Sequence, residues 1–138
     1  MKTLTVDAKV ENLEAVTEFV DCFLEENDCP MKTEMQVNIS IDEVFHNIVS
    51  YAYDEKNGKI EIQIESGDPV KLVLIFKDSG TPFNPLENAD PDITLSSDDR
   101  EAGGLGIFMV KKLMDNVTYS YENGQNILKL EKSWQAVL

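Results

Sequence analysis

Glu43 and Asn47 are the first residues whose types and spacing could do chemistry. They stand four positions apart in a helical pattern, so their side chains project from the same helix face about one turn apart. A carboxylate there could accept a proton, and the amide oxygen could bind Mg²⁺, which favours oxygen ligands and substrate phosphates. An arbitrary Glu/Asn pair is more often a solvated helix face, so this pair gains weight only from its surroundings.

Asp78 is a second carboxylate of interest, because it follows the apolar run 70–76 that predicts a buried strand. Ligands tend to bind at the C-terminal edges of strands in α/β sheets, and a carboxylate there could accept a hydrogen bond from an exocyclic amino group such as that of adenine. The sequence Asp78-Ser79-Gly80 is also ordinary turn chemistry, and that alternative stays open at this point.

Gly103, Gly104 and Gly106 crowd the point where a polar segment becomes an apolar helical pattern. Glycine lets the backbone approach a ligand closely, and a helix start offers unpaired N–H groups and the positive end of its dipole. The segment therefore predicts a phosphate site, although a glycine-rich helix start is by itself often only a tight turn.

Two helices must position the first of these groups. One is expected to begin after a capping Asn12 and to present an apolar face until residues 27–30 end it. The second is expected to begin near Thr33, which with Gln36 resembles a capping box, and to continue to about Tyr53. This second helix would carry the Glu/Asn pair.

Strands and one long loop account for most of the remaining chain. Apolar patterns predict strands near residues 4–8, 60–64, 70–76, 117–121 and 126–131, the last two joined by an Asn-Gly hairpin turn. From residue 81 to residue 102 the periodicity is lost, which is typical of a functional loop, and we expect a lid over about 81–103. A third helix is predicted from Leu105 to about Met114.

Length and charge limit the function classes. The 138 residues fit one domain spanning 1–138, and 42% of them are hydrophobic, which is enough for a core. A net charge of −14, from 12 basic and 26 acidic residues, argues against direct nucleic-acid binding. No 18-residue apolar run or signal peptide is present, so we expect a cytoplasmic protein without a membrane span and with Cys22 and Cys29 as free thiols. A single histidine argues against a structural zinc site.

The order Glu43-x-x-x-Asn47, Asp78-x-Gly80, Gly103-Gly104-x-Gly106 resembles the N, G1 and G2 boxes of the GHKL (Bergerat-fold) ATPase superfamily, which includes histidine kinases, gyrase-type ATPases and Hsp90. The phrases DSGTPFNP at 78–85 and GGLGIFMVKKLMD at 103–115 resemble the anti-sigma factor serine kinases of the RsbW type. This resemblance implies an α+β fold. We expect a two-layer α/β sandwich, in which three helices cover one face of a mixed, mostly antiparallel sheet, with an ATP lid.

The resemblance also implies roles for residues at a site for ATP and Mg²⁺. Glu43 would act as the general base toward a protein serine, and Asn47 would bind Mg²⁺. Asp78 would accept a hydrogen bond from the amino group of adenine. The expected nucleotide-binding residues are Asn47, Asp78, Gly80, Phe83, Arg100, Gly103, Gly104, Leu105 and Gly106. Phe83 is interpreted either as a wall of the adenine pocket or as a hydrophobic anchor of the loop. Tyr51 stands where many relatives carry His, and Tyr119 is interpreted as core or edge packing.

The function that the resemblance implies is a Mg-ATP-dependent serine/threonine protein kinase. It would phosphorylate an anti-anti-sigma factor, a STAS-type phosphoacceptor, and regulate a sigma factor by partner switching. The alternative is a nucleotide-dependent protein-interaction module of the same fold without kinase activity. The catalytic half of a histidine kinase is a weaker reading, because no histidine-bearing dimerisation helix precedes the domain. A homodimer stays open, since relatives often pair.

Overall fold

The computed structural model describes residues 1–53, 58–67, 70–87 and 104–135, with side chains omitted at 51–53 and 104–105. Its elements, in chain order, are β1 (Lys2–Asp7), η1 (Val10–Asn12), α1 (Leu13–Glu26), α2 (Met31–Asn47), η2 (Ile48–Tyr53), β2 (Lys59–Gly67), β3 (Lys71–Asp78), α3 (Gly104–Leu113), β4 (Asn116–Glu122) and β5 (Gln125–Ser133). Of the expected lid, residues 88–103 lie outside the described part. The predicted helices and strands are all present.

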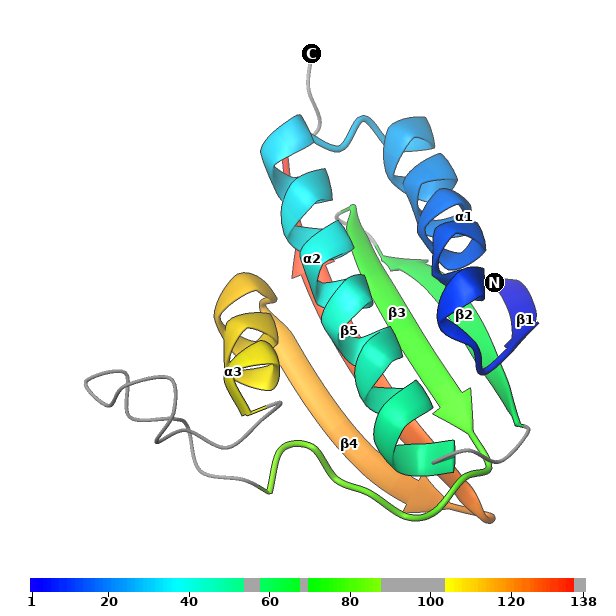
Figure 1. Cartoon of the computed structure of the whole chain (residues 1–138). Coiled ribbons are helices and arrows are strands. Elements are labelled where there is room, and N and C mark those ends of the chain that lie inside the picture. The colour runs from blue at the N-terminus through cyan, green and yellow to red at the C-terminus, as the bar shows by residue number, and fades with distance from the viewer. Residues whose placement is uncertain (54–57, 68–69, 88–103, 136–138) are drawn as a thin grey trace.

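The sheet has the strand order β1-β2-β3-β5-β4, and α1, α2 and α3 lie over one of its faces (Figure 1). This arrangement confirms the predicted two-layer sandwich with three helices on one face. All four strand pairings are antiparallel. The expectation of a mixed sheet is therefore corrected for the described strands, because each strand pairs with its sheet neighbour in the opposite direction.

Alternate residues of the strands form the sheet side of the core. On β2 the residues facing the helices are Ile60, Ile62 and Ile64, each no more than 1% exposed, as the alternating pattern predicts. On the central strand β3 the intervening Val73 is also 7% exposed, although no helix covers that face. Val73 pairs with Glu65 on β2 and Glu131 on β5, and we attribute its burial to the stems of these long side chains.

The helix boundaries differ from two sequence expectations. Asn12 precedes α1 but donates its side-chain amide to the carbonyl of Asp7, 2.9 Å away, and does not cap the helix. The α2 helix begins at Met31 after Pro30, so Thr33 lies inside its first turn and the predicted capping box is wrong. After Asn47 the helix continues as a π-helix, η2, which widens the backbone beside the candidate site. Among the described residues, none of the helices combines the length and apolar character needed to span a bilayer.

A cluster of acidic groups lies between α1 and α2. Burial is the main cause that raises the pKa of Asp21 and of Glu34, and the charge of Asp21 adds to the effect on Glu34. The Oδ1 atoms of Asp21 and Asn38 are buried without a hydrogen-bond partner among the described residues. Burial, with the charges of Glu34 and Asp21, raises the pKa of the Cys29 thiol to about 11, and Cys22 and Cys29 are both free thiols as expected.

The carboxyl pair predicts that stability falls as pH rises. Because the folded state raises both pKa values, it binds protons more tightly than the unfolded chain, and this stabilising contribution is lost as pH passes through the folded-state values. We expect Asp21→Asn to raise the free energy of unfolding by several tenths of a kcal/mol at pH 8 and by less at pH 5. Urea unfolding at both pH values measures this, with the exposed Glu18→Gln on the same helix as control. An equal destabilisation by Asp21→Asn at both pH values would contradict it.

Candidate nucleotide-binding site

The α2 helix presents the Glu/Asn pair at the edge of the core. Its buried residues Val44 and Phe45 are fully shielded and anchor it against the sheet, while Glu43 and Asn47 are half-buried. The Oδ1 atom of Asn47 is buried and has no hydrogen-bond partner among the described residues. An unpartnered buried acceptor carries a free-energy cost, so this atom is suited to receive a ligand donor or a cation.

Gly106 brings the start of α3 against Glu43. A Cβ atom added at Gly106 would overlap Glu43 Oε2 and lie 3.0 Å from its carboxyl carbon. The backbone of Gly106 does not require a positive φ, so the constraint here is space and not conformational freedom. Glycine at this position therefore lets the carboxylate of Glu43 lie directly on the first turn of α3.

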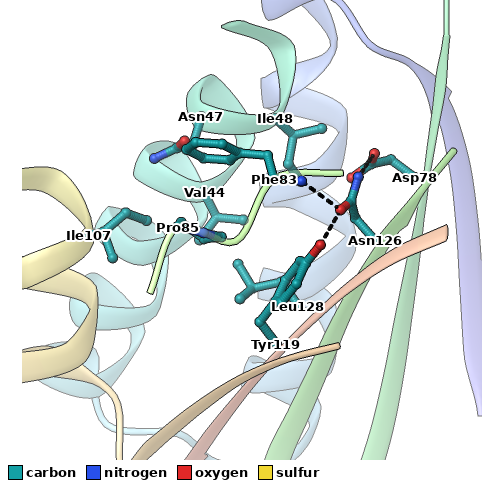
Figure 2. Close-up of a pocket in the computed structure, with 10 residues that line it drawn as sticks. All are labelled: Val44, Asn47, Ile48, Asp78, Phe83, Pro85, Ile107, Tyr119, Asn126 and Leu128. Atoms are coloured by element: carbon teal, nitrogen blue, oxygen red, sulfur yellow. Dashed lines mark hydrogen bonds between the residues drawn. The ribbon is translucent and has the colours of Figure 1, made fainter. Parts of the chain in front are cut away.

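A pocket opens between α2, α3 and the ends of the strands. It contains about 350 Å³ of empty space, part of it open to solvent. Its lining residues are Val44, Asn47, Ile48, Asp78, Phe83, Pro85, Ile107, Tyr119, Asn126 and Leu128. Figure 2 shows Asp78 and Ile107 on opposite sides of this pocket in that view. Mostly apolar walls with a few fixed polar groups are typical of a site for a flat heterocycle.

Asp78 is the buried charge of the pocket, with only 2% of its surface exposed. Its Oδ1 accepts hydrogen bonds from Gly80 N at 3.0 Å and from Asn126 Nδ2 at 2.9 Å. Burial raises the pKa of Asp78, and these two donors act in the opposite direction. Both of these bonds go to Oδ1, which leaves Oδ2 as the carboxylate oxygen that a ligand could reach.

Asn126 and Tyr119 belong to the same pocket and were missed by sequence reasoning. Asn126 is 5% exposed and bonds to Asp78, to Thr81 and to Phe83, while Tyr119 donates its hydroxyl to Asn126 Oδ1. One signal was available: Asn126 shares the inward alternation of Leu128 and Leu130, so it is a polar residue on a buried face. The pairing that places Asn126 opposite Asp78 is a long-range contact that the pattern alone does not give.

The structure brings most of the predicted site residues together. Asn47, Asp78 and Phe83 line one pocket, Gly80 closes the turn beneath Asp78, and Glu43 contacts Gly106. Gly104 is the first residue of α3, while the side chain of Leu105 is not described. Arg100 and Gly103 lie outside the described residues.

The donor set bears on the expected Mg²⁺ ion. Within the described residues there is no group of three or more His, Cys, Asp or Glu side chains that could enclose a metal. The orphaned Oδ1 of Asn47 fits Mg²⁺, which is often held by one or two protein oxygens together with substrate phosphates and water. Such an ion would bind together with the nucleotide, whose phosphates would supply further oxygen ligands.

A sequence comparison supplies the family. The profile of the histidine kinase-like ATPase domain matches residues 6–132, which is nearly the whole described fold. The chain belongs to this family. Membership confirms the GHKL resemblance and implies that the chain binds ATP.

Similar proteins with assigned names narrow the subfamily. The chain is 36% identical over 96 residues to the serine-protein kinase RsbW of Staphylococcus aureus strains bovine RF122 / ET3-1 and MRSA252, and 35% identical to that of strain JH9. Each match covers 64% of this chain and 59% of the relative, so the chain matches about three fifths of the length of these kinases. The expected likeness to RsbW-type proteins is confirmed.

Asp78→Asn tests the recognition of the base. An amide keeps the shape of the carboxylate but removes its charge, and we expect the affinity for ADP to fall about tenfold to a hundredfold. Calorimetry with Mg-ADP measures this, and Asp42→Asn, an exposed change on α2, serves as the control. Unchanged ADP affinity in a folded Asp78→Asn variant would remove Asp78 from the recognition of the nucleotide.

Proposed function

We propose that this chain is a Mg-ATP-dependent serine/threonine protein kinase that acts on an anti-anti-sigma factor and regulates a sigma factor by partner switching. The observation that carries the proposal is the contact between Glu43 and Gly106 beside the pocket of Asp78 and Asn47. It sets a carboxylate next to the helix start where a terminal phosphate would lie. The similarity to the serine-protein kinase RsbW supports the same class of reaction.

From the pocket we infer the direction in which the nucleotide would lie. Asp78 would accept a hydrogen bond from the exocyclic amino group of adenine. The apolar side chains of Ile48, Phe83 and Leu128 would contact the faces and edge of the adenine ring. The phosphates would then point across the pocket toward Ile107 and the first turn of α3. Free N–H groups at a helix start favour phosphate oxygens, which agrees with this direction.

Transfer needs a base and neutralised charge. Glu43 would take the proton of the serine hydroxyl while the serine oxygen forms a bond to the γ-phosphorus. The bond between the γ-phosphorus and the β–γ bridging oxygen breaks, and ADP leaves with that electron pair. Asn47 would hold Mg²⁺ through Oδ1, and the ion would neutralise charge on the phosphates. Glu43 and Asn47 are one helical turn apart on α2, so the base and the cation ligand are fixed by the same rigid element.

The protein partners follow from the resemblance to RsbW-type kinases. The proposed phosphoacceptor is a STAS-type anti-anti-sigma factor with a serine acceptor, and the alternative partner is a sigma factor. A net charge of −14 suits a partner with a basic face. We also propose a cytoplasmic location.

Glu43→Gln tests the proposed base. The amide is isosteric but cannot take a proton, so we expect transfer from labelled ATP to the serine antagonist to fall by a factor of about 100 or more. Affinity for Mg-ADP should change by less than about threefold, because Glu43 takes no part in the proposed recognition of adenine. The control is Asp42→Asn, which removes the neighbouring exposed charge that contacts His46.

Two outcomes separate the alternatives, and one control accompanies them. Equal transfer by Glu43→Gln and the unaltered chain would reject Glu43 as the base. Nucleotide-dependent binding of a sigma factor without any phosphorylated product would instead identify a protein-interaction module. An antagonist whose acceptor serine is replaced by alanine must stay unlabelled in every case.

Gly106→Ala tests the contact that carries the proposal. Alanine favours a helix by about 1 kcal/mol over glycine, so helix propensity alone predicts a more stable α3. The added Cβ would displace the Glu43 carboxylate, and we expect transfer to fall about tenfold or more while the protein stays folded. Gly67→Ala is the matched control, because the three atoms nearest to its Cβ would all belong to the flexible side chain of Lys71. Full transfer activity in Gly106→Ala would contradict the proposed geometry.

A further inference from the structure

The side-chain amide of Asn126 makes four hydrogen bonds at the edge of the pocket. Figure 2 shows those with Phe83 and Tyr119 as dashed lines. Its Nδ2 donates to Asp78 Oδ1 at 2.9 Å and to the carbonyl of Thr81 at 3.0 Å. Its Oδ1 accepts from the backbone N–H of Phe83 at 3.1 Å and from the hydroxyl of Tyr119. Both donors and both acceptor positions of the amide are therefore used within the protein.

The backbone fixes which end of this amide faces Asp78. The Thr81 carbonyl can only accept, and the Phe83 N–H can only donate, so the nitrogen and oxygen of Asn126 cannot be exchanged. The nitrogen must then donate to Asp78, and Tyr119 must donate to the oxygen. Asn126 has no group left for a ligand, so any effect on binding must act through the groups that it contacts, which are Asp78, Tyr119 and the 81–83 backbone.

We propose that Asn126 is a positioning residue that fixes two parts of the nucleotide pocket at once: the carboxylate of Asp78, as an acceptor, and the backbone that carries Phe83. This inference rests on the proposed nucleotide site, and it makes Asn126 the residue that orients the groups recognising adenine. Asn126 connects β5 to the end of β3 and to the 81–83 backbone. One side chain thus sets both the polar contact and the apolar wall for the ligand.

The electrostatics of Asp78 make this support necessary. Burial raises the pKa of Asp78, and the donors that oppose this effect are Asn126 and Gly80, with no cation among them in the described part of the chain. The other titratable group facing Asn126 is Tyr119 on β4, with Tyr121 and Glu87 as its nearby charged or titratable neighbours. The Tyr119 hydroxyl donates to Asn126 Oδ1 and not to Asp78. A protonated Asp78 would present a donor toward the amino group of adenine and would repel it.

The apolar wall depends on the same amide. Phe83 and Pro85 line the pocket from the segment 81–87, and Pro85 is buried. Within this segment Asn84 Oδ1 accepts from Leu86 N at 2.8 Å, which shapes the turn but does not attach it to the sheet. Asn126 makes that attachment through Thr81 and Phe83.

Asn126→Leu and Asn126→Ser test the proposal through a pH profile. Leucine has a similar volume and no donor, so we expect ADP affinity to fall about tenfold at pH 8 and to fall further at pH 6, because loss of the donor raises the pKa of Asp78 and favours its protonated form. Serine keeps one hydroxyl donor but cannot reach both backbone groups, so we expect about a threefold to tenfold loss at pH 8 and a smaller further loss at pH 6. Each affinity is divided by that of the unaltered chain at the same pH, which removes the titration of the ADP phosphates themselves.

Gln125→Leu is the matched control, since it makes the same chemical change one residue away on the opposite face of β5. It should follow the unaltered chain at both pH values. Circular dichroism and thermal melting establish that each variant is folded, and if Asn126→Leu does not fold, the serine variant decides. A folded Asn126 variant with unchanged ADP affinity and an unchanged pH profile overturns the inference. If the unaltered chain itself binds no ADP, the proposed function fails instead, so the two failures are distinguishable.

Discussion

The burial of the Asp78 carboxylate is the constraint on which the rest of the site depends. An ionised group that is 2% exposed costs free energy unless hydrogen bonds replace its water. Gly80 supplies one bond through the turn that follows β3, and Asn126 supplies the other from β5. The second bond exists only because the strands pair with Asp78 opposite Asn126. The hydrogen bonding of Asp78 in the pocket therefore depends on the register of the sheet.

The close approach of α2 and α3 is the second constraint, and it governs the other end of the pocket. Gly106 leaves the space that the Glu43 carboxylate occupies, while Asn47 places an unpaired oxygen one turn further along α2. The two constraints meet in the pocket, where Ile107 from α3 and Asp78 from β3 line opposite sides. The proposed adenine end and the proposed phosphate end would thus share one cavity built on rigid elements.

Local patterns predicted the elements well, because helix and strand periods are written in neighbouring residues. The face shared by Glu43 and Asn47 and the strand end at Asp78 follow from such patterns. Thr33 shows the limit: its side chain is suited to a cap, but Pro30 already lets the helix start earlier. Gly106 was assigned to the site for the freedom that glycine gives the backbone, whereas the structure shows that the side chain of Glu43 from another helix takes the space beside it. Its role toward the phosphates stays a prediction.

Asn126 and Tyr119 could not be assigned from local patterns, because their roles depend on which strands are neighbours and in which register. Asn126 meets Asp78 across 48 positions of the chain, and the choice of β5 as the neighbour of β3 is a property of the whole fold. The roles implied for Arg100 and Gly103 lie outside the described residues and stay predictions.

Discrimination between ATP and GTP tests the central claim most directly, because adenine presents an amino group where guanine presents a carbonyl oxygen. An ionised, buried Asp78 would accept from the first and repel the second. Calorimetry with the unaltered chain and Mg²⁺ should therefore give an affinity for ATP at least about tenfold higher than for GTP. Equal affinities, or no association with ATP by the folded protein, would contradict the account.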